Sequence, residues 1–304
     1  MKYTKNFSVV VPVWRGAIKY LPRLFDSIPD KEGIEIIVVD NSKDWVSRKE
    51  IDSPRDIILM HSAPERHAGG SRNEGMTVAK GKWLLFADAD DYYAPDAFDI
   101  FYSMINTEAE IVYTGMGGVY EDTGEVSHRG DRYAEMVRNY CEGNAGDDLL
   151  RFQFSSPCCK MVSHDLIDRH NLRYDEIKAS NDIYFSLTSG YYAKTITAVD
   201  KVTYIASVNR GSLTKRRDYE VINARLYATL HCNQFLKHNG LGKRQKSIMR
   251  NLYEARFYPL PQKWNLLKMV FKFRQNPFIG CSRWAISFFA VRNRDKRDKK
   301  YIVR

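Results

Sequence analysis

Residues 82–91 read Lys82-Trp83-Leu84-Leu85-Phe86-Ala87-Asp88-Ala89-Asp90-Asp91. The apolar run up to Ala87 does not alternate with polar residues, which is typical of a strand buried on both faces of a sheet. Asp88 and Asp90 follow it two residues apart, so in extended chain they would point the same way with Cα atoms about 6.6 Å apart. Two such carboxylates repel unless a cation lies between them. The pattern favours Mg²⁺ or Mn²⁺ with a diphosphate completing the shell; the alternative is a solvated acidic turn that caps the next helix.

The preceding sequence alternates strand and helix signals. Phe7–Val13 and Ile34–Asp40 are continuous β-branched runs, and the residues between them have helical spacing. The same reading predicts further elements at 56–60 (strand), 69–79 (helix), 95 onward (helix) and 111–113 (strand). This order predicts an α/β fold with a mainly parallel twisted sheet and helices on both faces. Ligands bind beyond the carboxyl ends of the strands of such sheets, so Asp40 and Asp88 should lie on the functional edge.

The second half of the chain is less regular. Glycines and polar residues from Gly115 to Gly146 predict an irregular or hairpin insertion. Beyond it, helices are expected at 147–152, 165–170 and 182–190 and a strand at 194–206. After Thr214 the chain is expected to be helical, with breaks at 238–242 and 259–261. We therefore expect a catalytic domain at 1–215, divided into halves at 1–95 and 96–215, and a helical region at 216–304.

The composition is that of a folded globular protein. The 304 residues are 44% hydrophobic and 28% charged, which excludes a disordered or fibrous chain. The five cysteines have no disulfide or zinc-site spacing, so a reducing cytoplasm is expected. The sequence offers no signal peptide and no apolar run long enough to span a membrane.

The charge is distributed unevenly along the chain. Residues 215–304 hold 22 Lys and Arg against 5 Asp and Glu, a net +17, whereas residues 1–214 hold 25 against 32, a net −7. A basic region of this kind indicates a polyanion, either nucleic acid or an anionic membrane face. Within it, residues 264–273 place Lys268 and Lys272 on one helical face and apolar Leu266, Val270 and Phe273 on the opposite one. Peripheral attachment to the inner membrane face is the hypothesis; a helical appendage with solvated lysines, or an oligomer contact, is the alternative.

Four segments in order resemble the inverting family-2 glycosyltransferases, which have the GT-A fold. Ser8–Trp14 resembles their first strand, Glu35–Ser42 their E-I-I-V-V-D-D-G-S, Gly69–Gly81 their A-R-N-x-G…A-x-G, and Asp88–Asp91 their D-x-D-D. Three weaker matches follow, at Pro157–Glu176, Asn181–Phe185 and Arg210–Thr214. Asn181 departs from the family's E-D-x-x-F, because an amide stands where the first acid is usual.

The resemblance implies a metal-dependent transfer of one sugar from a UDP-linked donor to a hydroxyl of a growing, lipid-linked glycan in surface-polysaccharide assembly. It implies Asp182 as the catalytic base and Asp90 as the ligand of Mn²⁺ or Mg²⁺. It implies donor contacts from Pro12, Val13, Asp40, Arg72, Asp88, Ala89, Asp90, Ser212 and Thr214. A nucleic-acid partner is not expected.

Each assignment has a structural alternative. Asp40 could cap a turn with Asn41-Ser42, Arg72 could be a surface residue, and Asp182 could cap its helix. Asp175 and Glu176 remain reserve candidates for the base.

Rival functions are weaker. A nucleotidyltransferase would need a glycine-rich basic loop after the first strand, and a dinucleotide dehydrogenase would need G-x-G-x-x-G there. A nucleic-acid-binding or other polyanion-binding protein would need a reading helix or stacking aromatics on a basic sheet.

Overall fold

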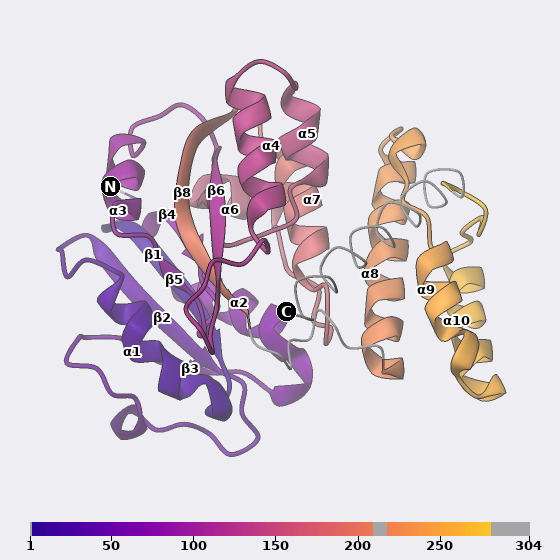
Figure 1. Cartoon of the computed structure of the whole chain (residues 1–304), viewed down its shortest axis with the longest axis horizontal. Helices are drawn as coiled ribbons and strands as arrows, with labels where there is room; N and C mark the ends of the chain where they lie inside the picture. Colours follow the sequence, from indigo (N-terminus) through magenta and orange to yellow (C-terminus); the bar gives the residue numbers. More distant parts are fainter. Residues whose placement is uncertain (1, 209–217, 281–304) are drawn as a thin grey trace. The chain divides into compact units, whose positions relative to one another are not determined.

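The computed structural model describes residues 2–208 and 218–280 (Figure 1). The chain forms two compact units, Met1–Ser212, called the first unit here, and Leu213–Arg304, called the second unit. The boundary expected near residue 215 lies outside the described residues.

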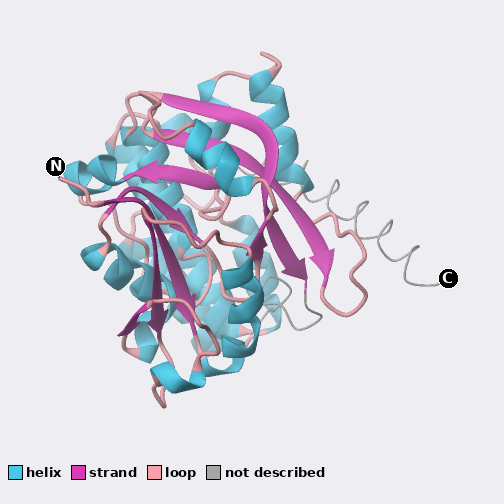
Figure 2. Ribbon diagram, turned by 90° about the vertical axis from the view of Figure 1, so that its left-hand side faces the viewer, coloured by secondary structure: helices cyan, strands magenta, loops and turns pink. Residues whose placement is uncertain are grey.

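The first unit is built on a curled sheet of eight strands (Figure 2) in the order β3-β2-β1-β4-β7-β6-β8-β5. The strands are β1 (Lys5–Val13), β2 (Ile34–Asp40), β3 (Ile58–His61), β4 (Gly81–Phe86), β5 (Tyr92–Tyr93), β6 (Ile111–Tyr120), β7 (Lys160–Ser163) and β8 (Ile196–Val208). β1 pairs in parallel with both β2 and β4, β2 with β3, and β6 with β8. Short β7 and β5 pair antiparallel with their neighbours. The mainly parallel α/β sheet predicted from the sequence is confirmed.

Helices pack against this sheet and alternate with its strands along the chain. They are α1 (Leu21–Asp26), α2 (His67–Val78), α3 (Ala97–Ser103), α4 (Asp131–Cys141), α5 (Asp147–Gln153), α6 (His164–His170) and α7 (Asp182–Tyr192). Helix α2 packs on β1 and β2. It comes so close that a Cβ on Gly75 would lie 2.5 Å from a methyl group of Val10. The apolar runs are fully buried in one core, as their lack of alternation predicts.

The expectation of an irregular insertion at 115–146 was wrong in part. β6 continues to Tyr120, and α4 follows within the same segment. The glycines that suggested turns instead permit close packing. A Cβ on Gly118 would lie 2.4 Å from Ser127 Oγ, and one on Gly130 would lie 2.2 Å from the carbonyl oxygen of Met116.

The second unit is helical, as predicted for residues after 214. It contains α8 (Tyr219–His238), α9 (Met249–Glu254) and α10 (Leu260–Lys272). Asp218 caps α8 by accepting a hydrogen bond from the N–H of Val221 at 3.2 Å. The core of this unit joins Ile222, Leu226, Leu230, Ile248, Ala255, Leu266 and Val270. Among the described helices, none has both the length and the apolar character that a bilayer crossing requires.

Candidate active site

The aspartates after β4 lie in a turn rather than in extended chain. β4 ends at Phe86, and the N–H of Asp91 bonds the carbonyl of Asp88 at 3.1 Å. The geometry expected for Asp88 and Asp90 from an extended strand was therefore wrong. Asp91 is turned inward, where its carboxylate accepts hydrogen bonds from Tyr204 Oη (3.0 Å) and from the N–H of Ser207 (2.7 Å). This leaves the first two aspartates at the carboxyl end of β4, the edge where such sheets bind ligands.

Asp90 lies in a setting that penalises its charge. Burial, followed by the charge of Asp88, raises its pKa. Its carbonyl accepts a hydrogen bond from Arg23 at 2.5 Å, and Arg23 also binds Glu121 and Ser207 Oγ. Through Arg23, the turn is thus fixed to β8 and to the segment after β6.

Arg72 of α2 joins the acidic turn to the start of α7. Its side chain is 5% exposed, one Nη atom binds Asp88 Oδ1, and the other donates to Asn181 Oδ1 at 2.9 Å. The guanidinium also lies over the ring of Tyr174, 5.3 Å from its centroid. The alternative of a surface role for Arg72 is therefore excluded. Asn181, the departure from the family pattern, keeps an oxygen for this hydrogen bond.

The next residue of the same helix holds the loop before α7. Asn73 donates to the carbonyl of Tyr174 at 3.0 Å and accepts from the N–H of Tyr174 at 2.8 Å. The ring of Tyr174 stacks on Phe185 at 4.1 Å. Gly69 lies so close to this loop that a Cβ there would be 2.0 Å from the carbonyl oxygen of Asp175. The Gly69–Asn73 segment thus anchors the second half of the unit to the first.

Asp182 is the first residue of α7 and is partly buried. Burial raises its pKa, and the charge of Arg72 opposes that shift. A second cation, Lys160 of β7, acts in the same direction as Arg72. Lys160 is fully buried, donates to Ser186 Oγ of α7 at 3.0 Å and lies 5.9 Å from the centroid of the Tyr113 ring. Burial lowers the pKa of Lys160 to about 8. Lys160 belongs to the weaker family match at Pro157–Glu176, but it was not among the predicted site residues.

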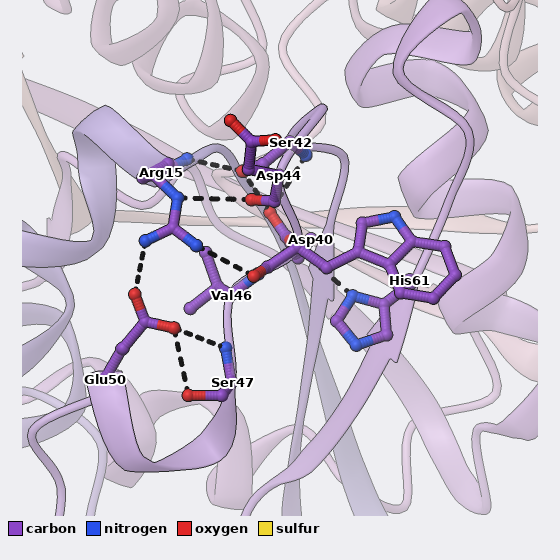
Figure 3. Close-up of polar contacts among 9 residues, drawn as sticks. Arg15, Asp40, Ser42, Asp44, Val46, Ser47, Glu50 and His61 are labelled. Carbon is purple, nitrogen blue, oxygen red and sulfur yellow. Dashed lines mark hydrogen bonds and ion pairs between the residues drawn. The ribbon is translucent and has the colours of Figure 1, made fainter.

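A second cluster lies at the end of β2 (Figure 3). Asp40 is fully buried, and its carboxylate accepts from Ser42 Oγ, from the N–H groups of Ser42 (2.9 Å) and Val46 (2.7 Å), and contacts His61 Nδ1 at 3.3 Å. These contacts match the turn-capping alternative, because the carboxylate is used inside its own loop.

Arg15, which lies just after β1, also binds this loop. It donates to the carbonyls of Asp44 (3.1 Å) and Trp45 (2.8 Å) and pairs with Glu50. The N–H of Ser47, then Arg15, lowers the pKa of Glu50 to about 2. The loop at residues 41–50 is therefore held in one conformation at the functional edge.

Two tryptophans at this edge were not among the predicted site residues. Trp14 follows β1 and Trp45 lies in the loop after β2, and each is 63% exposed. Trp45 stacks on His61 with centroids 4.6 Å apart. The indole of Trp14 lies across Gly16, where a Cβ would come within 2.1 Å of it. Exposed indoles beside a ligand-binding edge offer flat surfaces for a planar ring. The signal in the sequence was a tryptophan shortly after each of the first two strands.

The remaining predicted residues are placed as follows. Pro12, Val13 and Ala89 are buried, so their side chains belong to the core. Ser212 and Thr214 lie outside the described residues. Of the reserve bases, Glu176 is bound by Arg66 and Asn73, and Arg66 lowers its pKa.

Comparison with known proteins identifies the family. The sequence model described as glycosyl transferase family 2 matches residues 8–170, more than half of the chain. The chain belongs to glycosyl transferase family 2. The predicted family membership is thereby confirmed.

The relatives that this family-2 chain matches are bacterial proteins. EpsH of Bacillus subtilis is 22% identical over 225 residues, which are 70% of this chain and 64% of EpsH. The poly(ribitol-phosphate) beta-glucosyltransferase of Bacillus spizizenii is 24% identical over 67% of this chain and 32% of its own length. The succinoglycan biosynthesis protein ExoO of Rhizobium meliloti is 25% identical over 89% of this chain and 79% of ExoO. The chain thus spans less than two thirds of EpsH and about a third of the glucosyltransferase.

Among solved structures, S. aureus TarS in complex with UDP-GlcNAc matches with a TM-score of 0.60 at 20% identity, covering 88% of this chain and 80% of that one. This likeness establishes the GT-A fold of the family-2 enzyme.

The acidic turn offers oxygen ligands of the kind that a divalent metal ion prefers. Asp88 and Asp90 offer hard oxygen ligands, and burial and mutual charge already disfavour ionised Asp90, which a cation would reverse. Within residues 2–208 and 218–280, no group of three or more His, Cys, Asp and Glu side chains is arranged to hold a metal alone. The residues fit an ion such as Mg²⁺ or Mn²⁺ that takes one or two carboxylates and completes its shell with phosphates and water.

Proposed function

We propose that this enzyme transfers a sugar from a UDP-linked donor to a hydroxyl group of a growing surface glycan, with inversion at the anomeric carbon. The observation that carries the proposal is Arg72, which bonds Asp88 of the acidic turn and Asn181, the residue before Asp182. The buried guanidinium thus links the acidic turn, where a metal ion and the donor diphosphate would bind, to the residue before Asp182, a carboxylate whose pKa is raised. These are the two groups that a single displacement needs.

In this proposal the donor lies along the edge formed by the ends of β1, β2 and β4. The exposed indoles of Trp14 and Trp45 provide surfaces for the nucleobase, and the 41–50 loop, which Arg15 binds, keeps Trp45 in place. Asp40 supports that loop from within. Asp90, with Asp88, would hold Mn²⁺ or Mg²⁺. When bound, the ion offsets the charge that develops on the departing diphosphate.

Asp182 acts as the general base. It accepts the proton of the acceptor hydroxyl as that oxygen bonds to the anomeric carbon and the bond from this carbon to the diphosphate breaks. The donor becomes UDP, and the glycosidic bond forms on the opposite face of the sugar. Arg72 and Lys160 favour the ionised form of Asp182, which is the form that accepts a proton. Because Arg72 binds Asp88 as well, it aligns the base with the donor side of the site.

The acceptor and the cellular location belong to the same proposal. A growing, lipid-linked glycan suits an enzyme whose second unit is strongly basic, and we place it on the cytoplasmic side of the membrane as a peripheral protein. The described cysteines Cys141, Cys158 and Cys159 are free thiols, which suits a reducing compartment. The surface-polymer names of the relatives support this class of acceptor.

The test is calorimetric titration with UDP, UDP-glucose and UDP-N-acetylglucosamine, with and without Mn²⁺, on the wild type, Asp182→Asn and Asp90→Ala. We expect wild type and Asp182→Asn to bind a UDP-sugar alike, while Asp182→Asn loses transfer by about 10²–10⁴-fold. Asp90→Ala should lose the part of donor binding that Mn²⁺ adds. Absence of binding for every UDP compound with Mn²⁺ would refute the donor assignment, and full transfer by Asp182→Asn would refute the base.

A further inference from the structure

Helix α10 of the second unit has two apolar stripes, and within residues 218–280 only one of them is buried in the core. Leu266 and Val270, part of the apolar face predicted from the sequence, are buried in the core with α8. That face is therefore not available for a membrane. The second stripe, which we call the outer stripe, consists of Leu260, Trp264, Leu267 and Phe271.

The outer stripe is narrow and exposed to solvent. At about 100° of rotation per residue, its four residues fall within an arc of about 60°. Their exposed fractions range from 38% for Leu267 to 79% for Leu260. Phe257, which precedes the helix, and Phe278, which follows it, are also more than 70% exposed. Apolar side chains so concentrated on one surface mark an interaction site rather than scattered exposure.

Basic residues lie on both sides of the outer stripe. Lys263 flanks it on one side of the helix and Lys268 on the other, with the ammonium of Lys268 5.9 Å from the Trp264 ring centroid. Arg256 lies against the ring of Phe257 at 4.1 Å. Residues 249–278 contain six Lys and Arg and one acid. That acid, Glu254, is already paired with Arg250 at 3.1 Å.

We infer that the outer stripe is a membrane-docking surface, which inserts its aromatic and aliphatic side chains into an anionic bilayer while Lys263, Lys268 and Arg256 contact the head groups. An interfacial helix has this arrangement of apolar stripe and basic flanks, and long basic side chains extend to the head groups. The inference goes beyond the peripheral location proposed above, which rests on composition, by naming the surface. It does not depend on the chemistry of the active site.

Charge distinguishes this occupant from the others. A second copy would bring lysines opposite lysines in a symmetric contact. Residues 281–304 contain eight Lys and Arg against two acids, so their charge does not complement that of the surface either. Nucleic acid would suit the charges, but Leu260 and Leu267 have no planar face on which a base can stack. An anionic bilayer satisfies the charged and the aliphatic residues together.

The experiment is co-sedimentation of the full-length protein with phosphatidylcholine vesicles, with and without phosphatidylglycerol. We expect binding only to the anionic vesicles, and weaker binding as salt rises. Trp264→Ser/Phe271→Ser should lower the partition coefficient at least about tenfold. Lys263→Gln/Lys268→Gln should lower it roughly fivefold for each charge removed.

Two matched controls keep the result specific. Val126→Ser removes an apolar side chain that is 76% exposed in the first unit, and Lys237→Gln/Lys243→Gln removes two exposed charges elsewhere in the second unit. Both should bind like wild type. All variants should keep transfer to a soluble acceptor, so a failed docking surface and a failed active site give different results.

Three outcomes would overturn the inference. The first is equal binding of wild type and Trp264→Ser/Phe271→Ser to anionic vesicles. The second is a wild-type dimer in sedimentation velocity that this double variant abolishes, since a second copy would then cover the stripe. The third is tighter binding to single-stranded RNA than to anionic vesicles.

Discussion

Replacing Lys160 with methionine should stabilise the first unit near neutral pH, although it removes a charge that acts on Asp182, the proposed base. The ammonium of Lys160 is fully buried and donates a hydrogen bond to Ser186 Oγ at 3.0 Å. Methionine is close to lysine in length and carries no charge to desolvate. The native fold therefore bears a desolvation cost that the variant lacks.

The size and sign of the effect follow from the pKa of Lys160. Burial lowers it from 10.5 to about 8, and each unit corresponds to about 1.4 kcal/mol, so the charged form costs about 3 kcal/mol at pH 7. Between pH 8 and 10.5 the unfolded chain binds the proton that the folded chain has released. The free energy of unfolding of the wild type should thus rise with pH from about 8 to 10.5. As pH falls through the same window the desolvation cost returns, and it is complete below pH 8.

Urea unfolding followed by tryptophan fluorescence at pH 7, 8, 9 and 10 measures this effect. Trp83 is buried in the same sheet, so its emission reports unfolding of the first unit. We expect Lys160→Met to be up to about 3 kcal/mol more stable than wild type at pH 7, with the difference shrinking towards pH 10. Lys80→Met, at an exposed lysine, is the control and should show no such trend. A difference between Lys160→Met and wild type that stays constant from pH 7 to 10 would refute the reasoning.

The other predictions concern the active site. Because burial raises the pKa of Asp182, the transfer rate should fall as pH drops through a value above the ordinary range of an aspartate; Lys160→Met should move this acid limb to higher pH, and an unmoved limb would contradict the role of that cation. Arg72→Gln should lower transfer by at least about tenfold, measured as UDP release, because Asp88 and α7 lose their common partner; unchanged kcat would contradict it. Gly69→Ala should lower both the melting temperature and kcat, because the new Cβ would lie 2.0 Å from a backbone carbonyl; Gly146→Ala, where a Cβ meets nothing within 4 Å, is the control.

The sequence was sufficient for the parts of the fold that local pattern specifies. Ile34–Asp40 was predicted with the bounds that β2 has, because a run rich in β-branched residues and bounded by turn residues predicts a buried strand. Short β7 and β5 were missed, since four and two residues give too little pattern to detect. Helix α4 was missed because the glycines of β6 were taken for turns. Their close contacts depend on residues that only the folded chain brings near.

Side-chain partners were the least predictable part of the site. The spacing of Asp88 and Asp90 was visible, but the turn that separates their directions was not, because it depends on Asp91 reaching Tyr204 and Ser207 of β8. Asp40 was visible as an acid at a strand end, whereas its use by Val46 and His61 depends on how the following loop folds back. Lys160 lies in the weaker family match at Pro157–Glu176, but its burial was not predicted, because nothing in a sequence marks a lysine as buried.

The position of Arg72 explains why a motif in the first half of the unit matters for chemistry in the second. Arg72 holds Asp88 and Asn181 through its two Nη atoms, while adjacent Asn73 holds the backbone of Tyr174. Separating the buried guanidinium from the carboxylate of Asp88 would carry a large desolvation cost. A displacement of the acidic turn would therefore move Arg72 and, with it, Asn181, the residue before Asp182. The segment therefore sets the distance between the donor side and the base. Glycine at position 69 is required for the same reason. Only without a Cβ can α2 approach the loop at Asp175 closely enough for Arg72 to reach Asn181 and for Asn73 to reach Tyr174.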